Sequence, residues 1–287
     1  EMSNMEHFRD KVAIVTGAGS GIGRELAHGL ARAGAQLAIT DKNQERINQV
    51  LKEVKDMGVK AHSYLVDHSD FSAVNNFAKD FLSDFKSVDI LCLNAGIGVG
   101  GRIEEYEIKD WELAIGNNLW STIYMIHFFV PAMIRQGSGK ILITASAAGL
   151  VGIPGMAPYC TTKFALVGLA EVLRTELARH NINVSVLCPG IIKTNIIKDG
   201  RIHMRDQSKQ SQKPTIIDFY DQYGTEPYKV ARDGIRALTK NRGVQVSPLN
   251  TWPLWILKRV SPSFYQFLTR KIWERLFPSC KPKASTY

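Results

Sequence analysis

Short apolar runs alternate with longer amphipathic stretches along most of the chain. Apolar runs at 11–16, 36–40, 61–66, 88–93, 140–145, 183–187 and 244–246 predict buried strands. The stretches at 21–33, 44–57, 71–85, 110–135, 157–180 and 227–239 have the apolar spacing of helices. Strands that alternate with helices favour right-handed βαβ units. We therefore expect an α/β fold, a doubly wound parallel sheet with helices on both faces.

Two regions depart from this alternation. Residues 193–214 are polar and basic and have no periodicity, which predicts a mobile loop within a substrate loop at 190–225. Residues 250–277 hold three of the five tryptophans together with Phe264, Tyr265, Phe267 and Phe277. We therefore expect one α/β domain over 1–249, followed by a basic aromatic C-terminal extension over 250–287.

A glycine-rich turn follows the first predicted strand and opens the first helix. Its sequence is TGAGSGIG, from Thr16 to Gly23. Glycines let a phosphate approach the backbone, and a helix N-terminus offers free N–H groups and a positive dipole end. A plain glycine turn is the alternative, but the position between a strand and a helix favours a dinucleotide site. The candidate binding residues here are Gly17, Ser20, Gly21, Ile22 and Gly23.

The second predicted strand ends at Asp41, 24 residues after Gly17. A carboxylate at this position accepts hydrogen bonds from both ribose hydroxyls of adenosine and repels a 2′-phosphate. It therefore favours NAD over NADP. The neighbouring Lys42 would help to hold a 2′-phosphate, and Asp41 could instead be an ordinary turn residue.

The pair Tyr159 and Lys163 lies in a predicted helix with a spacing of four, which places both side chains on one face. A lysine ammonium next to a phenol favours the phenolate and brings tyrosine closer to acid–base work at neutral pH. By itself such a pair often arises by chance on a helix surface. Ser146 lies 13 residues earlier, just after a strand, where its hydroxyl could hold a substrate oxygen beside the tyrosine.

Further polar residues follow other strands, where ligand crevices open in such sheets. Asp67 ends the third strand, Asn94-Ala95-Gly96 ends the fourth, and Pro189-Gly190 ends the sixth, with Thr194 shortly after. Asn118 lies within a long predicted helix.

Together these motifs resemble the short-chain dehydrogenases/reductases over residues 10–246. The matching motifs are TGxxxGxG at 16–23, Asp67, NAG at 94–96, Asn118, Ser146 with YxxxK at 159–163, and PG…T at 189–194. The resemblance implies a Rossmann-like sheet of order 3-2-1-4-5-6-7. It implies that Tyr159 is the general acid–base and that Lys163 binds the nicotinamide ribose and lowers the pKa of the tyrosine. It also implies that Ser146 orients the substrate oxygen and that Asn118 holds a water in a proton relay.

The resemblance implies cofactor contacts as well. Asp67 would contact the adenine, Asn94 the adenosine side, and Thr194 with Ile192 the carboxamide, while Gly96 and Pro189 also belong to the cofactor site. It implies a homodimer or homotetramer formed through the helices that carry Asn118 and Tyr159. No metal site is predicted. The alternative to an active enzyme is a non-catalytic dinucleotide-binding scaffold or redox sensor.

The segments beside the predicted chemistry are apolar. Leu150–Met156 lies between the serine and the tyrosine, and Ile97-Gly98-Val99 follows the NAG turn. A hydrophobic cleft with few polar groups suits a lipophilic alcohol, ketone or aldehyde that is steroid-, retinoid- or fatty-acyl-like. These residues could instead only pack the core. The prediction is thus a hydrophobic small-molecule substrate and a role in lipid metabolism.

The net charge of +9 is concentrated in the extension. From Asn250 onward, seven bases accompany a single acid, Glu274. Bases interleaved with aromatics are typical of an interfacial helix on anionic lipid, so peripheral membrane contact through 250–277 is one hypothesis. The alternative is that the aromatics pack over the pocket or on another subunit. The body lacks a nucleic-acid-binding module, so we expect no nucleic-acid partner.

The remaining composition is that of an ordinary globular protein, with 45% hydrophobic and 22% charged residues. There is no apolar run of 18 residues and no apolar stretch of a secretory signal at the N-terminus. The four cysteines form no CxxC pair. A cytoplasmic location is therefore expected, with the membrane contact above as the one qualification.

Overall fold

The computed structural model describes residues 7–196, 199–202, 218, 220–249 and 252–276. The predicted mobile loop at 193–214 and the end of the extension, 277–287, fall largely or wholly outside these residues. The expectation about the N-terminal residues 1–6 also lies outside them.

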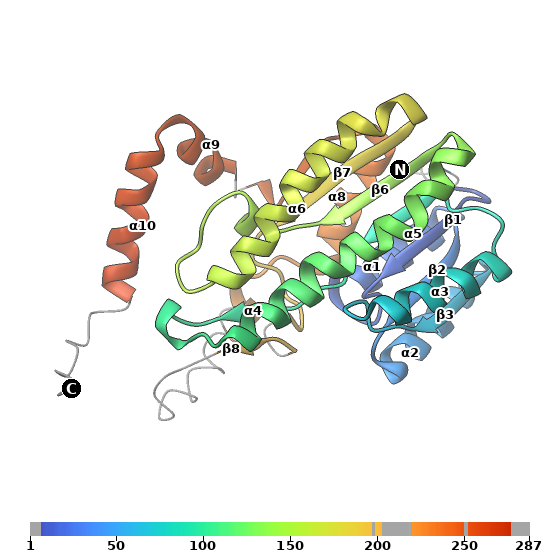
Figure 1. The fold of residues 1–287 in the computed structure, drawn as a ribbon, viewed down its shortest axis with the longest axis horizontal. Helices are drawn as coiled ribbons and strands as arrows, with labels where there is room; N and C mark the ends of the chain where they lie inside the picture. The colour runs from blue at the N-terminus through green and yellow to red at the C-terminus, as the bar shows by residue number, and fades with distance from the viewer. Residues whose placement is uncertain (1–6, 197–198, 203–217, 219, 250–251, 277–287) are drawn as a thin grey trace.

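Seven parallel strands form the central sheet (Figure 1). They are β1 (Val12–Thr16), β2 (Gln36–Asp41), β3 (Ala61–Leu65), β4 (Ile90–Leu93), β6 (Gly139–Thr144), β7 (Ile182–Pro189) and β9 (Val244–Ser247). Their order is β3-β2-β1-β4-β6-β7-β9. Counted among these seven alone, the order is 3-2-1-4-5-6-7, which confirms the predicted doubly wound sheet.

Helices cover both faces of this sheet because successive side chains of each strand point to opposite sides. In β1, Ala13 and Val15 pack with α1 (Gly21–Arg32), α2 (Gln44–Lys55) and α8 (Pro227–Lys240). Val12 and Ile14 pack on the other face with α3 (Phe71–Asp84), α5 (Ser121–Gln136) and α6 (Ala157–Glu176). The strands are therefore buried on both sides, as their continuous apolar runs predict.

One predicted helix is interrupted. The stretch expected as a single helix over 110–135 consists of α4 (Ile108–Ile115), a π-helical turn (Gly116–Trp120) and α5. Asn118 lies in the π turn and is fully buried. An inserted residue leaves the apolar periodicity almost unchanged, so the sequence pattern does not reveal it. Such turns are frequent at functional sites.

Small elements absent from the sequence prediction complete the fold. A two-stranded parallel sheet joins β5 (Val99–Gly100) to β8 (Arg201–Ile202), and each strand is too short to show a period. Single turns of 3-10 helix occur at Ile103–Glu105, Ala147–Gly149 and Ala178–His180. The last of these means that α6 ends at Glu176 rather than extending to 180 as predicted.

The extension forms two helices, α9 (Trp252–Val260) and α10 (Pro262–Leu276), here called the C-terminal hairpin. It lies at one end of the molecule, beside the start of α6 (Figure 1). Trp252 and Trp255 pack against the larger core cluster. The Lys258 ammonium donates a hydrogen bond to the carbonyl of Leu150 at 2.8 Å, and the Tyr265 hydroxyl donates to that of Gly152 at 2.6 Å. Within the described residues, no helix has the length and apolarity needed to cross a bilayer.

A buried histidine in the loop after β3 joins this loop to the end of β2. His68 Nε2 lies 3.0 Å from Thr40 Oγ1, and the Thr40 hydroxyl donates to the Val15 carbonyl at 3.4 Å. The imidazole therefore serves as the donor to the threonine, in its neutral form. Burial lowers the pKa of His68 to about 4 from an ordinary value of 6.5.

This pKa predicts a pH-dependent stability. Between pH 6.5 and about 4, the unfolded chain binds a proton at His68 that the folded chain does not. The contribution is therefore complete above pH 6.5 and is lost as the pH falls, by about 1.4 kcal/mol per pH unit for one proton. Urea unfolding of the wild type and of His68→Gln at several pH values should show a shallower acid loss in the variant. His127→Gln, at an exposed histidine, should match the wild type; equal slopes for all three proteins would contradict the assignment.

Candidate active site

A large cavity opens at the carboxyl ends of the parallel strands, with a volume of about 1020 Å³. It brings together residues that the sequence predicts from far-apart segments. These are Gly17, Ser20, Gly21, Ile22, Asp41, Asp67, Asn94, Gly96, Ser146, Tyr159, Lys163, Pro189, Ile192 and Thr194. Gly23 and Asn118 are also among the predicted site residues but do not line the cavity. Both instead hold the residues that line it in position, Gly23 by close packing and Asn118 by hydrogen bonds.

The glycine turn has a backbone that side chains would not permit. Gly17 and Gly21 have φ angles of +63° and +54°, in the left-handed region that favours glycine. A Cβ on Gly23 would lie 2.0 Å from the Gly17 carbonyl oxygen, so α1 can pack on the turn only with glycine there. The Asn94 amide donates to the carbonyls of Thr16 at 3.3 Å and Gly17 at 3.4 Å. Asn94 thus fixes the shape of the turn as well as lining the cavity.

The end of the cavity next to Asp41 carries both acids and bases. Asp41 Oδ2 accepts from the Gly19 N–H and Oδ1 from the Asn43 N–H, each at 2.9 Å. Lys42 and Arg46 also line the cavity, but Arg46 is paired with Asp199, with Nη1 and Oδ2 2.6 Å apart.

Asp67 lies nearby at the end of β3. Burial opposes ionisation of Asp67, but hydrogen bonds from the Ser69 hydroxyl at 2.6 Å and the Ser69 N–H at 2.9 Å keep its pKa below the ordinary value. Asp67 is therefore an ionised acceptor at neutral pH.

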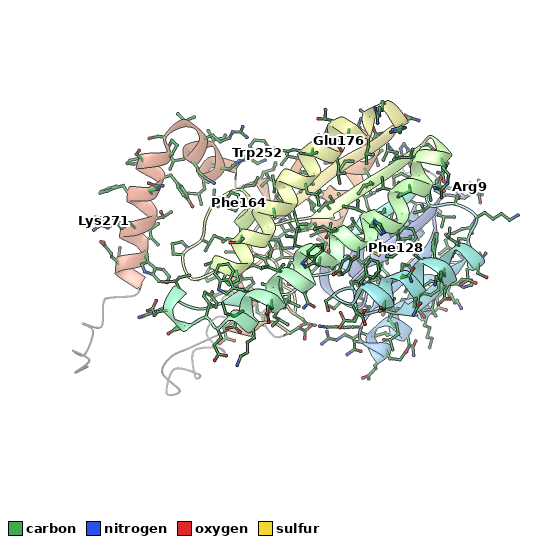
Figure 2. The ribbon with its side chains drawn as sticks, viewed as in Figure 1. Arg9, Phe128, Phe164, Glu176, Trp252 and Lys271 are labelled. Atoms are coloured by element: carbon green, nitrogen blue, oxygen red, sulfur yellow. The ribbon has the colours of Figure 1, made fainter. Side chains whose placement is uncertain are left out.

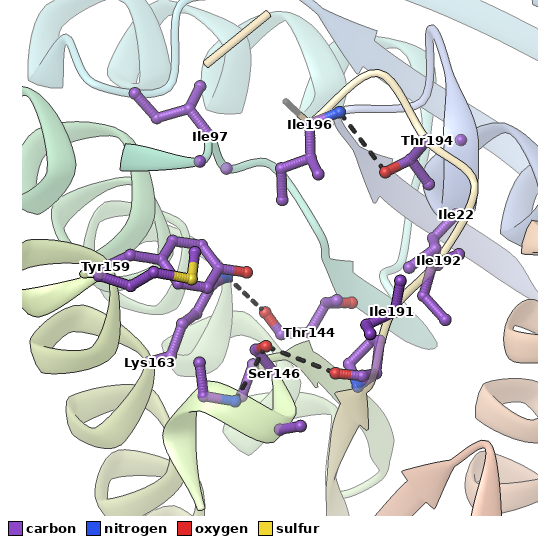
Figure 3. Close-up of a pocket in the computed structure, with 18 of the residues that line it drawn as sticks. Ile22, Ile97, Thr144, Ser146, Tyr159, Lys163, Ile191, Ile192, Thr194 and Ile196 are labelled. Atoms are coloured by element: carbon purple, nitrogen blue, oxygen red, sulfur yellow. Dashed lines mark hydrogen bonds between the residues drawn. The ribbon is translucent and has the colours of Figure 1, made fainter. Parts of the chain in front are cut away.

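The three candidate catalytic side chains meet at the opposite end of the cavity (Figure 3). Ser146 follows the end of β6, and Tyr159 lies in the first turn of α6, one turn before Lys163. The Ser146 hydroxyl accepts from the Ala148 N–H at 3.1 Å and donates to the Pro189 carbonyl at 3.4 Å. Lys163 Nζ donates to the Thr144 carbonyl at 3.1 Å and lies 5.5 Å from the centre of the Tyr159 ring.

Burial governs the ionisation of this group. It raises the pKa of Tyr159 above its ordinary value of 10, while a hydrogen bond with Ser146 acts in the opposite direction. It also lowers the pKa of Lys163 to about 8. The net shift of the phenol pKa is therefore upward, opposite to the direction expected from the lysine, because the cost of burying the phenolate outweighs the hydrogen bond with Ser146. The phenol is protonated at neutral pH, and about half of the lysine charge is lost near pH 8.

Asn118 supports the site from behind. Its side-chain oxygen accepts from the Ile97 N–H at 2.7 Å, and its amide donates to the Ile97 carbonyl at 3.1 Å and to Thr162 Oγ1 at 3.2 Å. It therefore ties the π turn to the loop after β4 and to α6. A Cβ on Gly96 would lie 2.9 Å from the Asn118 side-chain oxygen and 3.5 Å from Lys163 Nζ, so only glycine fits between them. The proton-relay role of Asn118 stays a prediction.

Part of the cavity wall comes from the C-terminal hairpin. From the sequence, contact with lipid, packing over the pocket and packing on another subunit were all open for this segment. Its lining residues are Leu254, Tyr265, Thr269, Ile272 and Trp273. Trp273 packs on Gly155, where an added Cβ would lie 3.2 Å from the indole. The aromatic residues of the extension indicated that this segment covers an apolar surface. Their spacing in the sequence did not predict which surface it is.

Thr144 is a further residue that sequence reasoning missed. Its hydroxyl is buried at the cavity and has no hydrogen-bond partner among the described residues. Together with the open backbone of the glycine turn, this hydroxyl fits a cavity shaped for a polar ligand such as a dinucleotide. Among the described residues, no three His, Cys, Asp or Glu side chains lie close enough to hold a metal ion.

Comparisons with known proteins agree with this geometry. The family model described as short chain dehydrogenase matches residues 11–204. SadH of Mycobacterium tuberculosis, named as an oxidoreductase, is 31% identical over 96% of this chain and 100% of its own length. Cyclohexanol dehydrogenase from an Acinetobacter species is 37% identical over 69% of this chain and 78% of its own.

A solved structure shares the fold over nearly the whole chain. It is a short chain dehydrogenase/reductase from Burkholderia phymatum in complex with NAD, with a TM-score of 0.83 and 26% sequence identity. The match covers 90% of this chain and 96% of the Burkholderia chain. With the family model, the relatives and the sheet in agreement, the chain belongs to the short-chain dehydrogenases/reductases and is an oxidoreductase of that family.

Proposed function

We propose that this oxidoreductase transfers a hydride between NAD(H) and a lipophilic alcohol, ketone or aldehyde, with Tyr159 as the general acid–base. The observation that carries the proposal is the convergence of Ser146, Tyr159 and Lys163 at one end of the cavity, with the glycine turn and Asp41 at the other. In this proposal the cavity has a nucleotide end, at the glycine turn and Asp41, and a reacting end, at Ser146, Tyr159 and Lys163.

The side chains at the reacting end have complementary roles in this proposal. A nicotinamide dinucleotide supplies or accepts the hydride when it is bound. The Ser146 hydroxyl holds the substrate oxygen, and the Tyr159 phenol gives a proton to that oxygen during reduction or takes one during oxidation. The Lys163 ammonium, close to the phenol ring, stabilises the phenolate that forms when the proton leaves. The raised pKa of Tyr159 keeps the phenol protonated at neutral pH, which favours the acid role.

NAD is the proposed cofactor because of the charges at the adenosine end. The Asp41 carboxylate is held in place by two backbone N–H groups, where it would repel a 2′-phosphate. Arg46, the nearest guanidinium, already satisfies Asp199. Lys42 remains as the base that would favour NADP, so the cofactor preference depends on the balance between Asp41 and Lys42.

The substrate class is proposed from the character of the wall. Apolar side chains come from two sides of the cavity: Val151, Ile153 and Met156 between the serine and the tyrosine, and Ile272 and Trp273 from the C-terminal hairpin. Such a wall, with the Ser146 hydroxyl as its polar anchor, fits a steroid-, retinoid- or fatty-acyl-like alcohol or carbonyl. The name of the Acinetobacter relative, cyclohexanol dehydrogenase, is in keeping with a cyclic secondary alcohol.

A homodimer or homotetramer is proposed from an exposed aromatic group on α3, the π turn and α5. Phe71 and Trp120 are each 46% exposed, and their rings contact Tyr124, while Phe71 also contacts Phe128. Figure 2 labels Phe128. Apolar surface of this kind is often buried between subunits.

The competing proposal for the whole chain, a non-catalytic scaffold or redox sensor, would leave the paired Tyr159 and Lys163 without a role.

The central test is turnover with a panel of lipophilic alcohols, ketones and aldehydes, followed by NAD(H) absorbance. Tyr159→Phe should lower kcat by about 10²- to 10⁴-fold, the range for loss of a general acid–base. The affinity for NADH should stay within a few-fold because the ring remains. Tyr228→Phe, at an exposed tyrosine on α8, is the matched control. NADH binding without turnover on any member would favour the scaffold, and near-native activity of Tyr159→Phe would exclude the mechanism.

The cofactor proposal has its own test. Asp41→Ala and Asp41→Asn should both raise the ratio of kcat/KM with NADP to that with NAD by about tenfold, equivalent to about 1.4 kcal/mol of relieved repulsion. The asparagine keeps an acceptor for the Gly19 or Asn43 N–H and removes only the charge. A ratio unchanged in both variants would show that Asp41 does not face the ribose.

The substrate proposal predicts a role for the indole of Trp273. Trp273→Ala should lower kcat/KM for bulky cyclic alcohols by about tenfold or more relative to cyclohexanol, because the large substrates lose an apolar wall. Phe267→Ala, on the exposed side of the same helix, should leave the ratio unchanged for dissolved substrates. If Trp273→Ala leaves selectivity unchanged, the hairpin does not contact the substrate.

A further inference from the structure

Helix α10 presents two different sides. Tyr265, Thr269 and Trp273 follow one another at intervals of four and line the cavity. Phe264, Phe267 and Lys271 lie on the other side of the helix, where Phe264 is 53% and Phe267 56% exposed. Figure 2 shows Lys271 on the side of α10 that faces away from the sheet. The inner side is explained by the cavity, and the outer side has no role in it.

The exposed apolar side chains of the two helices are here called the hairpin face. It comprises Ile256 and Val260 of α9 with Phe264 and Phe267 of α10. Val260 is 79% exposed, and the rings of Phe264 and Phe267 stack at 6.4 Å. Single exposed apolar residues are common, but four large ones on one short hairpin indicate a surface that is covered by something.

The charges of the hairpin indicate which kind of partner covers this face. Five bases and one acid lie between residues 252 and 276. Lys258 points inward, bonded to the Leu150 carbonyl and 4.3 Å from the Phe164 ring centre, so it belongs to the anchor. Arg259 lies 5.3 Å from the Trp255 ring centre and Lys271 5.9 Å from that of Phe267, so bases alternate with aromatics at the surface. A second copy would bring the same positive charge, whereas an anionic lipid surface brings the opposite one.

We propose that the hairpin face docks on an anionic lipid bilayer. Phe264 and Phe267 enter the boundary between headgroups and acyl chains, and Arg259 binds a headgroup phosphate. Arg270 and Lys271 share the single acid Glu274, at 2.7 and 3.7 Å, so this exposed group keeps a net positive charge toward the headgroups. This requires no spanning helix, since the hairpin lies in the plane of the interface. The surface is separate from every residue to which the reaction is assigned.

Docking in this way sets the cavity next to the lipid. The hairpin is fixed to the body by Tyr265 and Lys258, whose hydrogen bonds reach the Leu150–Gly152 segment between Ser146 and Tyr159. Its inner side is the cavity wall, so one helix separates the bilayer from the reacting end. Resting on the proposed function, this arrangement lets a lipophilic substrate pass from the membrane into the cavity without crossing water.

Vesicle flotation of the full chain tests the docking separately from catalysis. The probes are vesicles of phosphatidylcholine alone and vesicles with about a third phosphatidylglycerol. The wild type should float with the anionic vesicles at low salt, and flotation should fall as salt screens the charges. Phe264→Gln/Phe267→Gln and Arg270→Glu/Lys271→Glu should each lower the partition coefficient by about tenfold or more. Leu82→Gln/Lys79→Glu, on exposed positions of α3, is the matched control and should float as the wild type does.

Each result has one meaning. Turnover of a dissolved short-chain alcohol and the thermal midpoint should be unchanged in the two hairpin variants, which shows that the fold and the site are intact. Loss of flotation in these variants alone supports the proposal, even if no substrate is ever turned over. Equal flotation of all proteins, or none with anionic vesicles, overturns it. A lipid-independent decrease in oligomer size in the Phe264→Gln/Phe267→Gln variant, without flotation of the wild type, would assign the face to a second copy instead.

Discussion

The loop after β4 connects the two ends of the site, and the rest of the cavity depends on how closely it is packed. At one end, the Asn94 amide holds the carbonyls of the glycine turn, and a Cβ on Gly17 would lie 2.9 Å from the Ala95 Cα. At the other end, Gly96 lies against Lys163 and Asn118, whose side chain binds the backbone of Ile97. Three consecutive residues thus set the separation between the nucleotide end and the reacting end. A Cβ at Gly96 would lie 2.9 Å from the side-chain oxygen of Asn118, so a larger residue there would displace this buried amide.

Burial at the reacting end shifts the pKa values of its two titratable groups in opposite directions. It disfavours the phenolate of Tyr159 and the ammonium of Lys163, so each group is moved toward its neutral form. The Thr144 carbonyl partly compensates the lysine by accepting a hydrogen bond from Nζ. In the proposed mechanism the charged lysine stabilises the phenolate, and this support weakens as the pH rises through about 8.

The sequence was sufficient to predict the sheet and most of the site because both depend on local patterns. Continuous apolar runs predicted strands buried on two faces. Ser146, Tyr159 and Lys163 stood out because their spacing occurs together with the other motifs of the family that the chain resembles. The pattern was not sufficient where tertiary packing decides. The π turn at Asn118 shifts the helix by a residue without disturbing its apolar stripe, and the direction of the Tyr159 pKa depends on burial that spacing does not reveal. Trp273 was visible as an aromatic residue, but its place in the cavity wall follows from packing on Gly155, more than a hundred positions earlier.

The two hydrogen bonds that anchor the C-terminal hairpin join residues 108 and 113 positions apart in the chain. During synthesis the N-terminal segments emerge first, so the glycine turn, the β4 loop and the serine, tyrosine and lysine are all available before the hairpin leaves the ribosome. The wall contributed by the hairpin is therefore the last part of the cavity to be completed. In the proposed function this wall contacts the substrate, so selectivity and cofactor binding depend on separate parts of the chain that are synthesised at different times.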